Sequence, residues 1–217
     1  MGEIIMVRHG QANSGATTEE DYDRLSPLGF QQSEWLGAYF DAHDIRFDRV
    51  IAGTLRRHIE TRDGMGLGQN PTEDARLNEI IYFPLADAME RQFDIPVPRS
   101  EHAFATHVPQ TLRAWKDDQL TDIPESHAAF EARVFAVLDE AIARPERTLF
   151  VTSGGVIATI LGRILDLDVP ALAALLLQTR NSSYHVLRRH QDALHLHQFN
   201  ATPHLAHPDR HHALTFV

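Results

Sequence analysis

The stretch EIIMVRHG, residues 3–10, is a short apolar run that ends abruptly in arginine, histidine and glycine. Apolar and β-branched residues bounded by glycine predict a buried strand. The carboxyl ends of such strands face the ligand crevice of an open α/β sheet. Arg8 carries a fork of donors suited to phosphate or carboxylate, and His9 can act as a nucleophile or proton carrier near neutral pH. Gly10 permits a sharp turn beside a ligand. The stretch therefore predicts a reactive site at the end of the first strand.

Strands and helices alternate along the rest of the chain, which determines the predicted fold class. Apolar runs at 47–52 and 148–152 predict two more buried strands, and a helical pattern follows each of them. A turn between 184–187 and 194–199 predicts a hairpin near the end of the chain. We therefore expect the α/β class, as a three-layer α/β/α sandwich whose central sheet is mostly parallel with an antiparallel edge.

Capping residues predict where several helices begin. Ser26 precedes Pro27 and an amphipathic pattern, and Ser126 precedes another such pattern. Thr54 is expected to cap a helix over 55–62. These assignments place helices between the strands, as the alternation requires.

The composition excludes several classes of protein. The 217 residues suffice for a single domain over 1–217, in which 83–125 is interpreted as an inserted, partly helical segment. The formal net charge of −10 argues against nucleic acid as a partner. No apolar run reaches the length of a membrane span. Cysteine is absent and the first residues do not resemble a signal peptide, so we expect a cytoplasmic protein.

Three strand ends are expected to meet at one edge of the sheet. They carry Arg8 with His9, the basic segment 56–58, and the sequence Ser-Gly-Gly at 153–155. A strand–glycine–helix junction directs backbone N–H groups and a helix dipole toward the crevice, which favours an anion. Arginines, backbone donors and a histidine nucleophile suit phosphoryl transfer. Glu79 is the best-placed carboxylic acid for protonating a leaving alcohol.

These motifs resemble, in order and spacing, those of the histidine phosphatase superfamily, also called phosphoglycerate-mutase-like. The first is VRHG at 7–10, which contains the Arg-His-Gly (RHG) motif. The other matching segments are LSPLG at 25–29, LRRHIET at 55–61, LNE at 77–79, FVTSGGVI at 150–157, FN at 199–200 and HL at 204–205. The resemblance covers most of the chain.

The resemblance implies a role for each matching residue. His9 would be the nucleophile that becomes phosphorylated, Arg8 and Arg57 would bind phosphate, and Glu79 would act as acid and base. The further phosphate ligands that we expect are Ser153, Gly154 and Asn13. The resemblance implies a small phosphorylated substrate, no cofactor and no metal ion.

Two positions depart from the pattern of the family. Ser153 stands where the family usually has a second histidine, which donates to the transferring phosphoryl group. Loss of one charged donor would slow the reaction by roughly 10²–10³-fold. Ser153 fits a plain helix N-cap equally well, and His102 or His107 of the inserted segment could enter the crevice instead. Gly53 stands where the family often has serine.

We expect a phosphomonoester hydrolase that acts through a phosphohistidine on His9. One alternative is a phosphoglycerate mutase, which returns the phosphate to another oxygen of the substrate. The other is a non-catalytic protein that binds a phosphorylated ligand, because Ser153 replaces the second histidine. The inserted segment holds only scattered basic residues, which ranks the mutase lower. Substrate choice is expected to reside in that segment and in loops, so the pattern names neither the substrate nor the oligomeric state.

Overall fold

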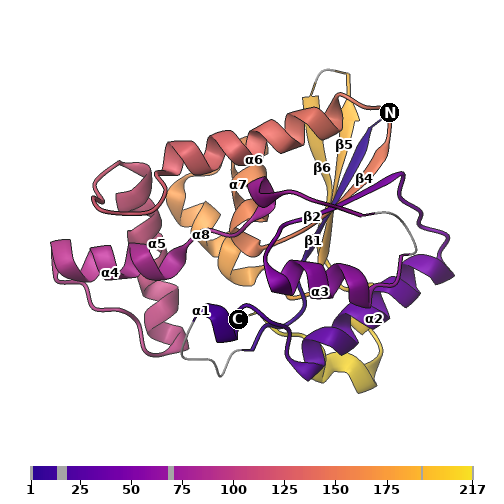
Figure 1. Cartoon of the computed structure of the whole chain (residues 1–217), viewed down its shortest axis with the longest axis horizontal. Coiled ribbons are helices and arrows are strands. Elements are labelled where there is room, and N and C mark those ends of the chain that lie inside the picture. Colours follow the sequence, from indigo (N-terminus) through magenta and orange to yellow (C-terminus); the bar gives the residue numbers. More distant parts are fainter. Residues whose placement is uncertain (1, 14–18, 68–70, 192, 217) are drawn as a thin grey trace.

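The computed structural model describes residues 2–13, 19–67, 71–191 and 193–216, and it contains a six-stranded sheet (Figure 1). The strands, in order across the sheet, are β3 (Thr72–Glu73), β2 (Arg49–Ala52), β4 (Arg147–Thr152), β1 (Glu3–Arg8), β5 (Tyr184–His190) and β6 (Ala193–Ala201). The pairs β1–β4, β4–β2 and β2–β3 are parallel, whereas β5 pairs antiparallel with both β1 and β6. The predicted sheet, mostly parallel with an antiparallel edge, is confirmed.

Helices cover both faces of this sheet and complete the three layers. The longer ones are α2 (Pro27–Ala42), α3 (Arg56–Gly64), α4 (Tyr82–Phe93), α5 (Glu101–Lys116), α6 (His127–Ile142), α7 (Gly154–Ile164) and α8 (Val169–Gln178). Shorter turns of helix are α1 (Glu19–Tyr22), Ala75–Leu77, Pro203–Leu205 and Pro208–Ala213. Within the described ranges, none of these helices is long and apolar enough to cross a bilayer.

Side chains of the central strand β1 alternate between two buried clusters. Ile4 and Met6 join the cluster that α4, α5, α6 and α7 cover, whereas Ile5 and Val7 join the cluster beneath α2. A strand has a side-chain period of two, and here both of its faces are buried. This is why EIIMV is apolar throughout and shows no polar alternation.

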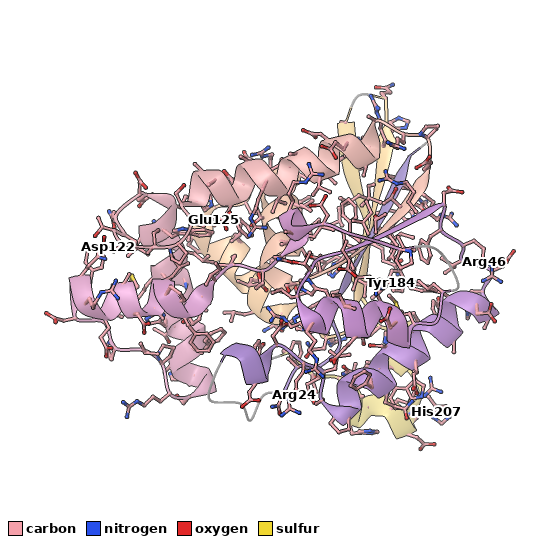
Figure 2. The ribbon with its side chains drawn as sticks, in the orientation of Figure 1. Arg24, Arg46, Asp122, Glu125, Tyr184 and His207 are labelled. Atoms are coloured by element: carbon pink, nitrogen blue, oxygen red, sulfur yellow. The ribbon has the colours of Figure 1, made fainter. Side chains whose placement is uncertain are left out.

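Aromatic rings hold α2 against the sheet. The ring of Phe40 in α2 contacts those of Tyr184 in β5 and Phe47, with centroids 5.5 and 5.3 Å apart. Burial raises the pKa of Tyr184 to about 12. Tyr184 lies inside the molecule, whereas Arg46 and His207 extend from its periphery (Figure 2). The helix is thereby fixed to strands that end near the predicted site.

The predicted helix caps hold, with one exception. Ser26 and Ser126 each accept the N–H of the residue three positions later, in α2 and α6. Thr54 does not cap α3, so that prediction is wrong. The carboxylate of Asp23 instead accepts the first two N–H groups of α3, at 2.9 and 3.3 Å. Asp23 is distant in sequence, and a local pattern cannot reveal it.

The inserted segment 83–125 carries most of α4 and all of α5, which lie beside each other at one end of the molecule (Figure 1). Pro109 lies inside α5 without ending it. The segment is therefore more helical than its several prolines would predict. Leu85, Leu112 and Trp115 point into the cluster that α6 and α7 also cover. The segment therefore packs onto the main core and forms one wall of it.

Helix α2 approaches the end of α3 closely at a glycine. A Cβ on Gly37 would lie 2.0 Å from the carbonyl oxygen of Met65, which belongs to the backbone and cannot rotate away. We expect Gly37→Ala to lower the free energy of unfolding by about 1–3 kcal/mol, measured by urea denaturation. Ala38→Ser, on the exposed face of the same helix, should change it by less than about 0.5 kcal/mol. Equal losses in the two variants would contradict the close approach.

Candidate active site

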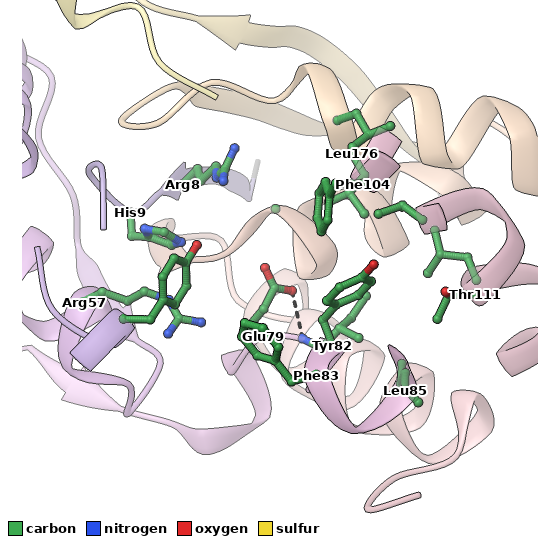
Figure 3. A pocket seen from close by; sticks show the side chains of 16 residues that line it. Arg8, His9, Arg57, Glu79, Tyr82, Phe83, Leu85, Phe104, Thr111 and Leu176 are labelled. Carbon is green, nitrogen blue, oxygen red and sulfur yellow. Dashed lines mark hydrogen bonds between the residues drawn. The ribbon is translucent and has the colours of Figure 1, made fainter. Parts of the chain in front are cut away.

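A cavity of about 210 Å³ lies at the carboxyl ends of the parallel strands (Figure 3). Four residues that the sequence predicts as catalytic line it together, namely Arg8, His9, Arg57 and Glu79, and Gly154 joins them. Apolar and aromatic side chains form most of the remaining wall, among them Tyr82, Phe83, Phe104, Leu112 and Leu176. Figure 3 shows the charged groups gathered at one end of the cavity. The predicted convergence of strand ends thus produces a real pocket.

His9 is held so that one ring nitrogen is available. Its backbone N–H donates to the carbonyl of Thr152 in β4 at 2.9 Å, and its Nδ1 lies 2.7 Å from the carbonyl oxygen of Gly10. A carbonyl only accepts, so Nδ1 carries the ring proton and Nε2 keeps its lone pair. Burial and the nearby charges of Arg57 and Arg8 hold the pKa of His9 well below its usual value. The imidazole is therefore neutral, the state that a nucleophile requires.

Arg8 directs its guanidinium toward the same cavity from the end of β1. Its Nη1 donates to the carbonyl oxygen of Thr179, while its buried Nε has no hydrogen-bond partner among the described residues. That Nε lies 3.7 Å from the place that a Cβ on Gly154 would take. Burial lowers the pKa of Arg8, but a guanidinium remains charged in proteins. An unsatisfied buried donor is costly, and an anionic oxygen in the cavity would satisfy it.

Arg57 enters the cavity from the first turn of α3, supported by residues before that helix. Its Nη1 lies 2.9 Å from Oδ1 of Asp23, and the side chain is only 3% exposed. The ring of Tyr22 stacks near its guanidinium, 5.3 Å from centroid to carbon. Asp23, which also caps α3, was not predicted as a site residue. It fixes the direction of the second guanidinium.

Glu79 occupies the N-terminus of α7. Its Oε1 accepts the N–H of Gly155 at 3.0 Å and that of Ile80 at 2.8 Å. The sequence predicts that the backbone donors of this junction face a phosphate, whereas here one of them holds the carboxylate. A Cβ on Gly155 would lie 2.2 Å from this Oε1, so the glycine makes room for the contact. The acid/base candidate is thus oriented by two backbone donors at the edge of the cavity (Figure 3).

Two predicted phosphate ligands lie outside the cavity lining. Ser153 is fully buried, and its Oγ lies 2.5 Å from Nε2 of His58. It occupies the N-cap position of α7, as the sequence allows, but its side chain accepts no N–H from that helix. Asn13 lies in the loop after β1 and donates its side-chain amide to the carbonyl of Asp21 at 3.2 Å. Neither side chain borders the cavity in this structure.

The two histidines of the inserted segment do not supply an imidazole to the cavity. His102 is exposed at the start of α5. Nδ1 of His107 lies 2.7 Å from the hydroxyl of Tyr82, behind the cavity wall. In the part of the chain that the structure describes, no group of three His, Cys, Asp or Glu side chains could hold a metal ion.

His58 is the functional candidate that the sequence reasoning did not assign. Its ring is fully buried in α3, with its centroid 5.7 Å from that of His9. The only signal in the sequence is its place directly after Arg57. The sequence motifs also do not mark the four aromatic residues of the cavity wall, which are Tyr22, Tyr82, Phe83 and Phe104.

Two solved structures resemble this chain in fold. The chain is similar over most of its length to a phosphoserine phosphatase mutant from Entamoeba histolytica, with a TM-score of 0.70 and 16% identity; the match covers 94% of this chain and 100% of that one. It is also similar to a mycobacterial glucosyl-3-phosphoglycerate phosphatase, with a TM-score of 0.65 and 24% identity; the match covers 92% of this chain and 99% of that one. These two likenesses concern the fold.

A curated relative matches over a shorter stretch. It is the rat mitochondrial serine/threonine-protein phosphatase PGAM5, 32% identical over 60 residues, which are 28% of this chain and 20% of the relative. The match thus spans about a fifth of the relative's length. The model of the histidine phosphatase superfamily (branch 1) matches residues 4–202. The chain therefore belongs to the histidine phosphatase superfamily.

Proposed function

We propose that this protein hydrolyses phosphomonoesters through a phosphohistidine on His9. The observation that carries the proposal is a neutral, buried imidazole whose Nε2 has its lone pair available, in a cavity with two guanidinium groups and one carboxyl group. Arg8 and Arg57 supply the positive charge that a transferring phosphoryl group requires. Their pairing with a histidine nucleophile is the arrangement that the family membership leads us to expect.

In the first half-reaction, Nε2 of His9 attacks phosphorus and the bond from phosphorus to the ester oxygen breaks. Glu79 delivers a proton to that oxygen, so the product leaves as a neutral alcohol. Nδ1 keeps its proton and donates it in a hydrogen bond to the carbonyl oxygen of Gly10, which holds the ring in position as Nε2 becomes bonded. Both arginines stabilise the equatorial oxygens throughout the transfer.

In the second half-reaction, water replaces the alcohol. The Glu79 carboxylate, left by the first step, takes a proton from this water as its oxygen attacks phosphorus. The bond from phosphorus to Nε2 breaks, phosphate leaves, and both residues return to their starting states. The same carboxyl group thus serves as acid and then as base.

The cavity wall indicates which alcohols leave. Among the described residues, the lining contains no basic side chain other than Arg8, His9 and Arg57, and aromatic and aliphatic groups dominate it. A leaving group that carries a carboxylate, as in 3-phosphoglycerate, would bury that charge without a partner, which is costly. We therefore propose an ester with an aryl or other apolar leaving group. The same lack of a carboxylate partner disfavours mutase chemistry on phosphoglycerate.

Steady-state kinetics tests this proposal. We expect kcat/KM for an aryl phosphate to exceed that for 3-phosphoglycerate by at least about 100-fold, since one buried unpaired charge outweighs a lost apolar contact. Phe104→Ala removes part of the wall and should raise KM for the aryl ester about tenfold with little change in kcat. Phe93→Ala is the matched control, because Phe93 is half exposed and lies outside this cavity.

Two results would contradict the proposal. Absence of phosphate release from any ester, with phosphate still bound, would favour a non-catalytic binding protein. Faster turnover of 3-phosphoglycerate than of the aryl ester would overturn the apolar substrate class while leaving the hydrolase intact.

A further inference from the structure

A buried histidine and a buried serine form a pair directly beside the nucleophile. Nε2 of His58 lies 2.5 Å from Oγ of Ser153, and the His58 ring is centred 5.7 Å from that of His9. Both His58 and Ser153 have no exposed surface. Ser153 is also the residue between Thr152, whose carbonyl accepts the N–H of His9, and Gly154, which lines the cavity. The pair therefore adjoins the place where a phosphoryl group must sit.

The other ring nitrogen of His58 decides where the proton lies. Nδ1 has no hydrogen-bond partner among the described residues. Burial, followed by the charge of Arg57, holds the pKa of His58 well below its usual value, so the ring carries one proton. Buried N–H groups without a partner are rarer in proteins than buried acceptors without one, and we assign the ring proton of His58 on that basis. The proton is therefore on Nε2, which donates to the hydroxyl oxygen of Ser153.

This assignment leaves the hydroxyl hydrogen of Ser153 available. Ser153 has no other side-chain hydrogen bond among the described residues, and its Oγ does not cap α7. Since its oxygen accepts from His58, its own proton can be donated elsewhere. A donor whose oxygen already accepts a hydrogen bond is polarised and donates more strongly.

The glycine at position 53 belongs to the same arrangement. A Cβ on Gly53 would lie 2.2 Å from Nδ1 of His58 and 2.9 Å from its Cε1. Any larger residue at this position would displace the imidazole. Gly53 and Ser153 thus both lie against one side chain, the ring of His58.

Ser153 lies just behind the cavity lining in this structure, next in sequence to Gly154, which is part of that lining. We propose that, when substrate binds, Ser153 turns its hydroxyl hydrogen toward an oxygen of the transferring phosphoryl group, and that His58 positions and polarises this hydroxyl from behind. The inference rests on the proposed function and assigns Ser153 as a catalytic residue and His58 as a positioning residue. The chain thereby retains an imidazole at its site, placed on α3 and acting through the serine.

Four variants test the pair against an aryl phosphate. Ser153→Ala removes the donor, and His58→Leu keeps most of the buried volume but removes the support. We expect kcat to fall about 100-fold in each, with KM changed less than about threefold. His58→Gln can place a side-chain N–H near the position of Nε2 and should restore most of kcat. The double variant Ser153→Ala with His58→Leu should be no slower than Ser153→Ala alone, because His58 acts through the hydroxyl.

A binding measurement keeps the test independent of turnover. Orthovanadate mimics the five-coordinate phosphorus of the transition state, so the pair should contribute more to vanadate binding than to phosphate binding. By calorimetry, vanadate affinity should fall about 100-fold in Ser153→Ala and His58→Leu, and phosphate affinity less than tenfold. His43→Leu, an exposed histidine in the same chain, is the control and should match the wild type.

The outcomes separate the two proposals. A wild type that releases no phosphate contradicts the proposed function, and the vanadate series then decides the pair alone. Wild-type turnover with unchanged kcat and unchanged vanadate affinity in Ser153→Ala overturns the pair. Losses that multiply in the double variant would also overturn it, because they would show that His58 acts separately from the hydroxyl.

Discussion

Replacing His9 by alanine is expected to lower the rate of phosphate release by at least about 10⁴-fold, since the variant lacks the nitrogen on which the proposed covalent intermediate forms. Nε2 of His9 keeps its lone pair because Nδ1 is tied to Gly10, and burial keeps the ring neutral. Arg8 and Arg57 would remain, so the variant should still bind phosphate. The measurement is the initial rate with an aryl phosphate, together with recovery of the phosphoenzyme after a base quench, which preserves phosphohistidine.

The control for this result is another histidine of the same chain. His102→Ala alters an exposed residue outside the cavity and should leave both the rate and the phosphoenzyme unchanged. With a substrate that carries radioactive phosphate, the wild type should yield labelled protein after the base quench, and His9→Ala should yield none. Label that persists in His9→Ala would place the intermediate on another side chain and contradict the proposed mechanism.

The second large effect is loss of stability in mild acid. Burial lowers the pKa of His185 and of His204 to about 3, with the charges of Arg8 and Arg210 adding to the shift. His9 and His58 are shifted in the same direction. In the unfolded chain, the pKa of each of these four histidines returns to about 6.5. Below that pH the unfolded state binds protons that the folded state excludes, so stability falls as the pH falls.

The size of this effect follows from the shift. At pH 5, about 1.5 units below the unfolded pKa, each such histidine removes about 2 kcal/mol from the free energy of unfolding. His185 and His204 together remove about 4 kcal/mol, a large share of the roughly 5–15 kcal/mol of a typical domain. The loss should begin near pH 6.5 and continue toward pH 3. Urea denaturation at pH 7.5 and pH 5 measures it.

A substitution separates this cause from general acid effects. His204→Gln removes one buried histidine and should reduce the difference in stability between the two pH values by about 2 kcal/mol. His43→Gln alters an exposed histidine and should leave the difference unchanged. A free energy of unfolding that stays flat from pH 7.5 to pH 5 in the wild type would contradict the prediction.

Local sequence predicts the strands and the residues that lie at their carboxyl ends. Arg8, His9 and Gly154 follow buried apolar runs, so their meeting at one sheet edge follows from topology. Glu79 was chosen as the best-placed carboxylic acid, and Arg57 was chosen within the basic segment 56–58 by resemblance; the structure brings both to the same cavity.

Contacts between distant segments escape a local pattern. Asp23 caps α3 and holds Arg57, yet it is separated from both by a helix and a strand. His58 looks like an ordinary helix residue until Ser153 and Gly53 are seen against its ring. The apolar wall depends on how α4 and α5 pack, which their amphipathic sequences do not specify. The role of Asn13 also depends on loop geometry, which turns its amide toward Asp21.

The two ends of the cavity have different origins in the chain. Arg8, His9 and Gly154 are held by the central strands, where His9 also bonds to Thr152 across the sheet. Much of the opposite wall comes from one contiguous stretch, 80–112, on the periphery of the fold. Under the proposed function, substitutions within this one stretch would change the contacts of the leaving group, while Arg8 and His9 stay on the central strands.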